Sequence, residues 1–209
     1  VQIHTALASA YLLDEKSDAA RSELEIAQDL SADRETITEI ERLLLSADDP
    51  DFEMHLGEIT DLLNAGSELN PEDVEFLELA VEKAPSFTTG YLHLASAYLN
   101  WDEPADALDT LLDAQSQLPA DPDIATLLAR VLWQMNETQL AFDCLNKSLA
   151  KTSNHVPLLA TMGRFLFEDG QAEEAKTFLM KAEALDPQNP VLNDTRIYIA
   201  NIISDLGTD

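Results

Sequence analysis

The sequence is poor in the residues that build disulfides, tight turns and membrane spans. Its 209 residues include one cysteine and six glycines. A single cysteine cannot form a disulfide framework, and Cys144 is expected to be a small buried hydrophobe. No apolar run approaches the ~20 residues of a membrane-spanning helix. No sustained alternation of apolar and polar residues predicts a strand, so an all-helical fold is favoured.

Basic side chains are also scarce. Forty acidic residues face twelve basic ones, giving a net charge of −28, and Lys83 is the only cation between Leu43 and Ala129. A field of this sign repels nucleic acid and anionic membranes, so neither is expected as a direct partner. The acidic surface either attracts a basic partner or only keeps the protein solvated, and the second interpretation is favoured.

Motifs of catalysis and cofactor binding are missing. The sequence has no phosphate-binding glycine loop, no paired histidines of a zinc protease and no serine elbow. Its four histidines are scattered: His4, His55, His93 and His155. An acidic cluster lacks the spacing and glycine of a calcium loop and is expected to be a capping turn; it comprises Asp48, Asp49, Asp51 and Glu53. We therefore expect no enzyme, no cofactor and no metal site.

What the sequence does contain is a 34-residue period. Large apolar residues recur at this step, each followed by a small one: Leu94, Leu128 and Met162, then Ala95, Ala129 and Gly163. Further columns hold alanine or leucine: Ala107, Ala141 and Ala175, then Leu111, Leu145 and Leu179. Residues 1–34 follow the same pattern. The spacing of three and four within each unit predicts two amphipathic helices.

These columns resemble the tetratricopeptide repeat (TPR), a helix-turn-helix unit with the same 34-residue length. The resemblance implies an all-α, right-handed α-solenoid of stacked repeats, because one hairpin alone cannot bury its apolar stripe. It predicts units at 1–34, 88–121, 122–155 and 156–189, and a capping helix at 190–209. Val1 is not a methionine and opens a repeat, so we expect the chain to be part of a longer protein.

One stretch breaks the period. Residues 54–87 resemble a degenerate repeat, since Thr60, Asp61 and Asn64 occupy positions of large, small and aromatic residues. Residues 35–53 then form a solitary helix, Thr38 to Leu45, and a turn. The alternative is a helix pair at 36–65 with an extra helix at 71–84, and the sequence does not decide between them.

In TPR arrays the first helices of successive units line a concave groove that binds peptides or partner segments. Carried onto this sequence, the groove positions fall in columns: Ser96, Arg130 and Arg164; Leu99, Trp133 and Phe167; Asn100, Gln134 and Glu168; with Thr126, Thr161 and His93 on the same side. Each arginine precedes its aromatic residue by three, so each is expected to lie along that ring. Alternatively, the aromatic residues belong to the core and the arginines pair with carboxylates.

The leading hypothesis is a non-enzymatic scaffold that binds a protein or peptide segment in this groove, as part of a larger protein or assembly. Some arrays of the family clamp the carboxylate of a chaperone tail, but this column lacks their lysine and asparagine. The alternatives are a self-assembling module or a regulatory segment of a multidomain enzyme. Self-association would use the C-terminal helix, which is apolar nearly all round: Ile197, Tyr198, Ile199, Ile202 and Ile203. The missing disulfides weakly favour the cytoplasm.

Overall fold

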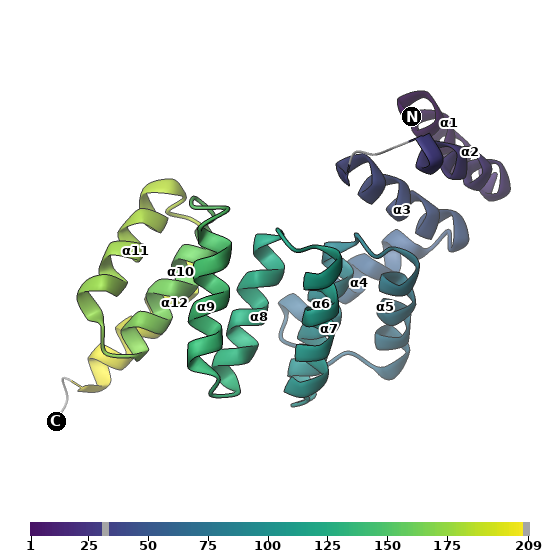
Figure 1. Cartoon of the computed structure of the whole chain (residues 1–209). Coiled ribbons are helices and arrows are strands. Elements are labelled where there is room, and N and C mark those ends of the chain that lie inside the picture. The colour runs from purple at the N-terminus through teal and green to yellow at the C-terminus, as the bar shows by residue number, and fades with distance from the viewer. Residues whose placement is uncertain (31–33, 207–209) are drawn as a thin grey trace. The chain divides into compact units, whose positions relative to one another are not determined.

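The computed structural model describes residues 1–30 and 34–206, which form twelve helices and no strand (Figure 1). The predicted all-α class is therefore confirmed. The chain divides into two compact units, Val1–Leu118 and Pro119–Asp209, and each unit is described by itself.

Within residues 1–30 and 34–206, unit 1 contains seven helices and unit 2 contains five. Those of unit 1 are α1 (Gln2–Leu13), α2 (Ser17–Leu30), α3 (Arg34–Asp48), α4 (Phe52–Asn64), α5 (Pro71–Lys83), α6 (Thr88–Asn100) and α7 (Pro104–Gln117). Those of unit 2 are α8 (Pro122–Gln134), α9 (Thr138–Leu149), α10 (Val156–Glu168), α11 (Ala172–Leu185) and α12 (Pro190–Leu206).

Four pairs of helices form the hairpins that the 34-residue period predicts: α1–α2, α6–α7, α8–α9 and α10–α11. The repeated alanines of the second helices are buried: Ala20, Ala107, Ala141 and Ala175. Gly163 shows why small residues recur, because a Cβ atom there would lie 2.7 Å from Cδ2 of Leu179 on the facing helix. Such a distance is shorter than van der Waals contact, so the close approach of α10 and α11 depends on this glycine.

The turn inside each hairpin also repeats. A left-handed backbone conformation occurs at Glu15, Asp102, Asn136 and Gly170, with φ angles of 57°, 60°, 64° and 82°. The last three are separated by the same 34-residue step. Glycine, asparagine and aspartate tolerate this conformation best, so three of the four turns carry a residue suited to it.

The segment from α3 to α5 departs from this rhythm. Helix α3 is longer than the solitary helix predicted at Thr38–Leu45. The predicted boundary between the segment 35–53 and the degenerate repeat 54–87 falls inside α4, which begins at Phe52. The three helices lie close to the ranges of the alternative, 36–65 and 71–84. A 34-residue step back from the turn residue Asp102 leads to Glu68, but the left-handed turn residue here is Gly66, two positions earlier.

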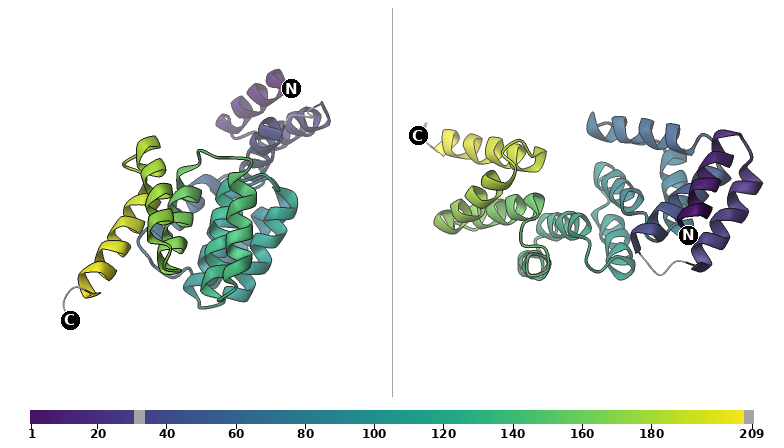
Figure 2. Two further views of the ribbon diagram at one scale, coloured as in Figure 1. Left: turned by 60° about the vertical axis from the view of Figure 1, so that its left-hand side comes forward. Right: turned by 90° about the horizontal axis from the view of Figure 1, so that it is seen from above.

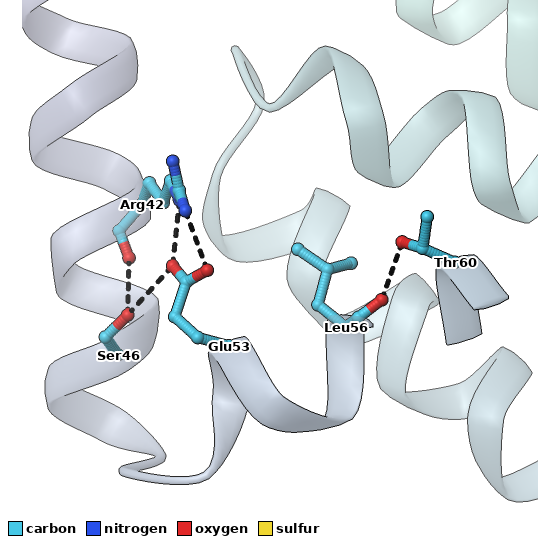
Figure 3. Close-up of polar contacts among 5 residues, drawn as sticks. All are labelled: Arg42, Ser46, Glu53, Leu56 and Thr60. Carbon is cyan, nitrogen blue, oxygen red and sulfur yellow. Dashed lines mark hydrogen bonds and ion pairs between the residues drawn. The ribbon is translucent and has the colours of Figure 1, made fainter. Parts of the chain in front are cut away.

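Polar contacts fix the corner between α3 and α4 (Figure 3). Arg42 donates from Nε and Nη2 to the two carboxylate oxygens of Glu53, at 2.8 and 2.7 Å. The hydrogen bond to Glu53 raises the pKa of Arg42. Asp48 forms ion pairs with Arg21 and Lys83. Two members of the acidic cluster are therefore neutralised by cations, and among residues 1–30 and 34–206 no group of acidic, histidine or cysteine side chains is arranged to hold a metal ion.

The C-terminal helix α12 packs mainly against α10 (Figures 1 and 2). Leu192 and Thr195 are buried there, whereas Ile197 and Ile203 are 61% and 57% exposed. A 34-residue step from Gly163 leads to Ile197, so α12 has a bulky side chain where α10 has the glycine that admits its partner helix. Within the described part of the chain, no helix is both long enough and apolar enough to cross a membrane.

Candidate partner-binding site

Two of the predicted groove residues, Arg130 and Arg164, lie together in one pocket of unit 2. This arginine pocket has a volume of about 110 Å³ and lies where α8, α10 and α12 meet. Its lining comprises Arg130, Thr161, Arg164, Val191, Asp194 and Thr195. The 34-residue step explains the convergence, since Arg130 and Arg164 occupy the same position on successive first helices.

Arg130 is the less constrained of the two arginines. Among the described residues it makes no ion pair, although Asp194 and Arg164 are near enough to influence it. Burial lowers the pKa of Arg130, the positive charge of Arg164 lowers it further, and Asp194 acts in the opposite direction. Arg130 is nevertheless exposed to solvent. An arginine stays charged at neutral pH despite such a shift, so Arg130 presents at the pocket a cation that has no ion pair within the described residues, with Asp194 as the nearby carboxylate.

Arg164 is held by two contacts within unit 2. Its Nε donates to Oε1 of Glu168 at 2.8 Å. Its Cζ lies 3.9 Å from the centre of the Tyr198 ring, a cation–π geometry. Arg164 thus lies over Tyr198 rather than along Phe167, which is half-buried. The predicted pairing on Phe167 is wrong because α12 brings a second aromatic ring to the guanidinium.

Trp133 belongs to an aromatic cluster rather than to Arg130. Its ring stacks on Phe165, with centroids 4.2 Å apart and planes 10° apart, and meets Phe142 edge-on at 5.6 Å. Its indole Nε1 donates to Oε2 of Glu168 at 2.6 Å. Glu168 therefore links Trp133 and Arg164, and the aromatic side chain contributes to packing between α8, α9 and α10, as the alternative interpretation held. Gln134, the neighbour of Trp133, is exposed.

Four further predicted groove residues lie on α6 in unit 1, where three of them make internal contacts. Nε2 of His93 is 2.9 Å from Oγ1 of Thr60, and burial lowers the pKa of His93. Asn100 donates to the carbonyl of Ser67 at 3.3 Å, and Ser96 donates to the carbonyl of Leu92. Leu99 is half-buried. A role of these four residues in partner binding stays a prediction.

Sequence reasoning missed the residues that α12 adds to the pocket. Tyr198 lies one 34-residue step after Arg164, and Thr195 lies one such step after Thr161, so both follow residues already assigned to the groove side. Thr161 and Thr195 are 2% and 3% exposed. Extending the columns into the capping helix would therefore have placed Tyr198 and Thr195. The position of the Asp194 carboxylate depends on how α12 packs and has no such signal.

Comparisons with known proteins agree with this architecture. A family model of the tetratricopeptide repeat matches residues 156–189, the α10–α11 hairpin. The chain is similar to the solved structure of TTC0263, a thermophilic TPR protein of Thermus thermophilus, at 19% identity with a TM-score of 0.54, covering 97% of this chain and 98% of that one. It is also similar to a structure of MamA protein, at 19% identity with a TM-score of 0.50, covering 90% of this chain and 92% of that one. Comparison with curated protein sequences gives no match.

Proposed function

From the tetratricopeptide-repeat fold of this chain, we propose that it is a non-enzymatic module that binds a partner protein segment at the arginine pocket. Stacked TPR hairpins are typical of protein-interaction scaffolds, and the resemblance to that family is confirmed. Binding at Arg130 and Arg164, and the absence of catalysis, are the parts that we propose.

The observation that carries the proposal is the state of Arg130. Arg130 is an exposed cation that makes no ion pair among the described residues, and Arg164 beside it in the same pocket adds repulsion between like charges. An anion that enters the pocket relieves this repulsion. Within the described part of the chain, no neighbouring group supplies this anion through an ion pair with Arg130. Glu168 already accepts hydrogen bonds from Arg164 and Trp133.

The chemistry of the pocket favours a carboxylate on an extended segment. A guanidinium holds a carboxylate through two parallel hydrogen bonds, and the Thr161 hydroxyl at the pocket wall offers a further donor. Val191 and the ring of Tyr198 supply apolar surface beside these donors. An acidic residue flanked by apolar ones matches this lining.

Peptide selection followed by one matched pair of variants tests the proposal. Octapeptides displayed on phage would be selected on the full chain, synthesised with a fluorescent label and measured by anisotropy. We expect the selected peptides to carry carboxylates, and Arg130→Ala to weaken binding at least tenfold, since truncating one partner of a desolvated charge pair costs ~2–5 kcal/mol.

Lys147→Ala is the control, because Lys147 is an exposed cation of the same unit on α9. Equal affinities of the Arg130→Ala and Lys147→Ala proteins would overturn the proposal. Arg164→Ala is expected to weaken binding too, but it also removes the contacts to Glu168 and Tyr198, so its effect includes a change in packing.

The net charge of −28 supports two further parts of the proposal. Neither nucleic acid nor an anionic membrane is a direct partner, since both repel a protein of this sign. Flotation with phosphatidylserine vesicles and gel shift with duplex DNA at low salt test this, and binding in either assay would contradict it. A cytoplasmic location stays a prediction.

Self-assembly is the second candidate function, favoured by the exposed isoleucines of α12. Ile197 and Ile203 leave apolar surface open on this helix, and a second copy of the chain would cover it. Sedimentation at several protein concentrations tests for such a dimer. A strict monomer whose behaviour is unchanged by Ile203→Glu would remove this candidate.

A further inference from the structure

Unit 1 contains a pocket of a different character from the arginine pocket. It lies between α3, α4 and α5 and has a volume of about 50 Å³. Its floor and walls are apolar, and charged side chains stand only at its edge. The lining comprises Leu45, Phe52, Phe76, Leu79 and Ala80, with Asp48, Asp49 and Lys83 at the edge. We call it the α3–α5 pocket.

The break in the 34-residue period creates this pocket. Helix α3 contributes Leu45 to a buried apolar cluster with residues of α4 and α5, and the Arg42–Glu53 pair joins α3 to α4 (Figure 3). The far wall is fixed by Phe52 and Phe76, whose ring centroids are 5.2 Å apart. Because these walls are tied to the rest of unit 1, the pocket is built into the fold.

The outer wall of the pocket is Leu79, which is 48% exposed. On the surface of α5, Glu75 lies four residues before Leu79 and Glu82 lies three after it, so both share its face of the helix. Both are exposed, and neither forms an ion pair within the described residues. The pocket entrance is therefore an apolar patch flanked by carboxylates.

The charges at the edge leave a negative excess. Lys83, the cation of the lining, is already paired with Asp48, which also binds Arg21. Asp49 accepts a backbone hydrogen bond from the amide of Asp51 at 3.0 Å. Unit 1 as a whole has 27 acidic and five basic residues, a net charge of −22. A cationic ligand is thus attracted both locally and by the surrounding field.

We infer that the α3–α5 pocket is a second docking site, which takes a large apolar side chain carried by a lysine- or arginine-rich segment of a partner. The apolar side chain fills the space between Leu45, Phe76 and Leu79, while flanking cations pair with Glu75, Glu82 and Asp49. An apolar anchor with charged neighbours is the usual composition of an interaction hot spot and its rim. The site shares no residue with the arginine pocket and takes a ligand of the opposite charge.

Two labelled peptides test the apolar part of this inference. The probe is acetyl-Lys-Lys-Leu-Lys-Lys-amide with a fluorophore on an added terminal glycine, and its control has serine in place of leucine. We expect the leucine peptide to bind the full chain about tenfold more tightly than the serine peptide, because covering the leucine side chain removes apolar surface from water. Equal affinities would mean that only charge attracts the peptide, and would overturn the inference.

A matched pair of protein variants locates the site. Leu79→Ser is compared with Leu112→Ser, because Leu112 on α7 is 47% exposed and also belongs to unit 1. We expect the leucine peptide to lose its advantage with Leu79→Ser and to keep it with Leu112→Ser. Similar losses, or losses in neither variant, would contradict docking at the α3–α5 pocket. Circular dichroism of both variants checks that the exposed substitutions leave the helices intact.

A second pair of protein variants tests the expected contacts between the cations of the peptide and the carboxylates at the pocket entrance. Glu75→Gln with Glu82→Gln is compared with Asp106→Asn with Asp109→Asn, two exposed carboxylates of α7. Both double variants change the net charge equally, so long-range attraction changes equally, and only the first is expected to weaken the leucine peptide, by about three- to tenfold at low salt. An identical effect in the two would contradict the local pairing. Arg130→Ala is expected to leave this peptide unaffected, which separates the test from that of the arginine pocket.

Discussion

The α10–α11 hairpin of unit 2 and the α3–α5 segment of unit 1 hold their helices together by different means. In the hairpin, Gly163 and the buried Ala175 let two helix backbones approach closely. In the α3–α5 segment, side-chain hydrogen bonds and ion pairs join the helices, such as Arg42 to Glu53 and Glu41 to Ser86. Where the 34-residue period holds, spacing is set by small residues. Where it breaks, larger apolar residues such as Leu45, Phe52 and Leu77 form a shared buried cluster, and polar contacts add to it.

The two units differ in charge as well. Unit 1 has a net charge of −22, whereas unit 2, with 13 acidic and seven basic residues, has a net charge of −6. The cations of unit 2 include the two arginines of its pocket, and the acids of unit 1 flank the entrance of the α3–α5 pocket. The difference supports the proposal that the two pockets take ligands of opposite charge.

The largest expected effect concerns the close packing of the hairpin. Ala175→Leu should lower the free energy of unfolding by ~1–3 kcal/mol, because the α10–α11 contact has no space for three further carbon atoms. Ala172→Leu on the exposed side of the same helix is the control and should cost almost nothing. Urea denaturation measures both. If the two substitutions are equally harmless, small residues do not set the spacing of these helices.

The matching change in the α3–α5 segment removes a buried carboxylate. Glu41 is 8% exposed and accepts hydrogen bonds from the amide and hydroxyl of Ser86, the former at 2.9 Å. Glu41→Ala should cost ~1–2 kcal/mol, since it leaves a partly buried backbone donor without its acceptor. The exposed Glu39 of the same helix is the control, and Glu39→Ala should be nearly neutral. Equal stability of the two variants would show that apolar packing alone holds α3.

A smaller effect is expected at the α3–α4 corner. Arg42 and Glu53 are about half exposed, so water screens their pairing. A double-mutant cycle of Arg42→Ala and Glu53→Ala should give a coupling free energy of ~0.2–1 kcal/mol, which falls as salt is added. A coupling near zero at low salt would mean that the bidentate geometry does not stabilise the corner.

The smallest effect tests the charge difference, and the two tryptophans serve as probes. Trp101 lies in unit 1 and Trp133 in unit 2, so Trp133→Phe and Trp101→Phe each leave one unit with a fluorescent reporter. Raising the salt from about 20 mM to about 300 mM should raise the unfolding temperature seen by Trp101 roughly 2 °C more than that seen by Trp133, because self-repulsion is stronger in unit 1. Identical shifts would mean that the charge difference does not affect stability.

The sequence predicted the hairpins because their signal repeats. Leu111, Leu145 and Ala141 lie at fixed steps and are fully buried, so the period alone assigns their roles. The arginine pocket followed from the same period, since equal positions on successive first helices converge. The partner of Arg164 could not be predicted from a spacing of three, because Phe167 and Tyr198 compete for the guanidinium, and α12 decides between them.

The α3–α5 segment was predicted less well because nothing in it repeats. The corner contact joins Arg42 to Glu53, eleven residues apart, and His55 reaches Asp73 at 2.9 Å across two helices. Each pair joins two different helices, so its spacing in the sequence does not reveal the contact. The acidic cluster was expected to be a capping turn, and its ion pairs with Arg21 and Lys83 could not be predicted because they depend on tertiary packing.

The contact between Glu41 and Ser86 bears on how unit 1 unfolds. In repeat arrays each hairpin contacts only its neighbours, so folding proceeds locally and single repeats can open separately. Glu41 and Ser86 are 45 residues apart, which is longer than one repeat. Opening α4 and α5 therefore also strains the attachment of α3 to the start of the α6 hairpin. Hydrogen exchange should then show the amides of α3 to α6 opening as one cooperative unit, larger than a single hairpin.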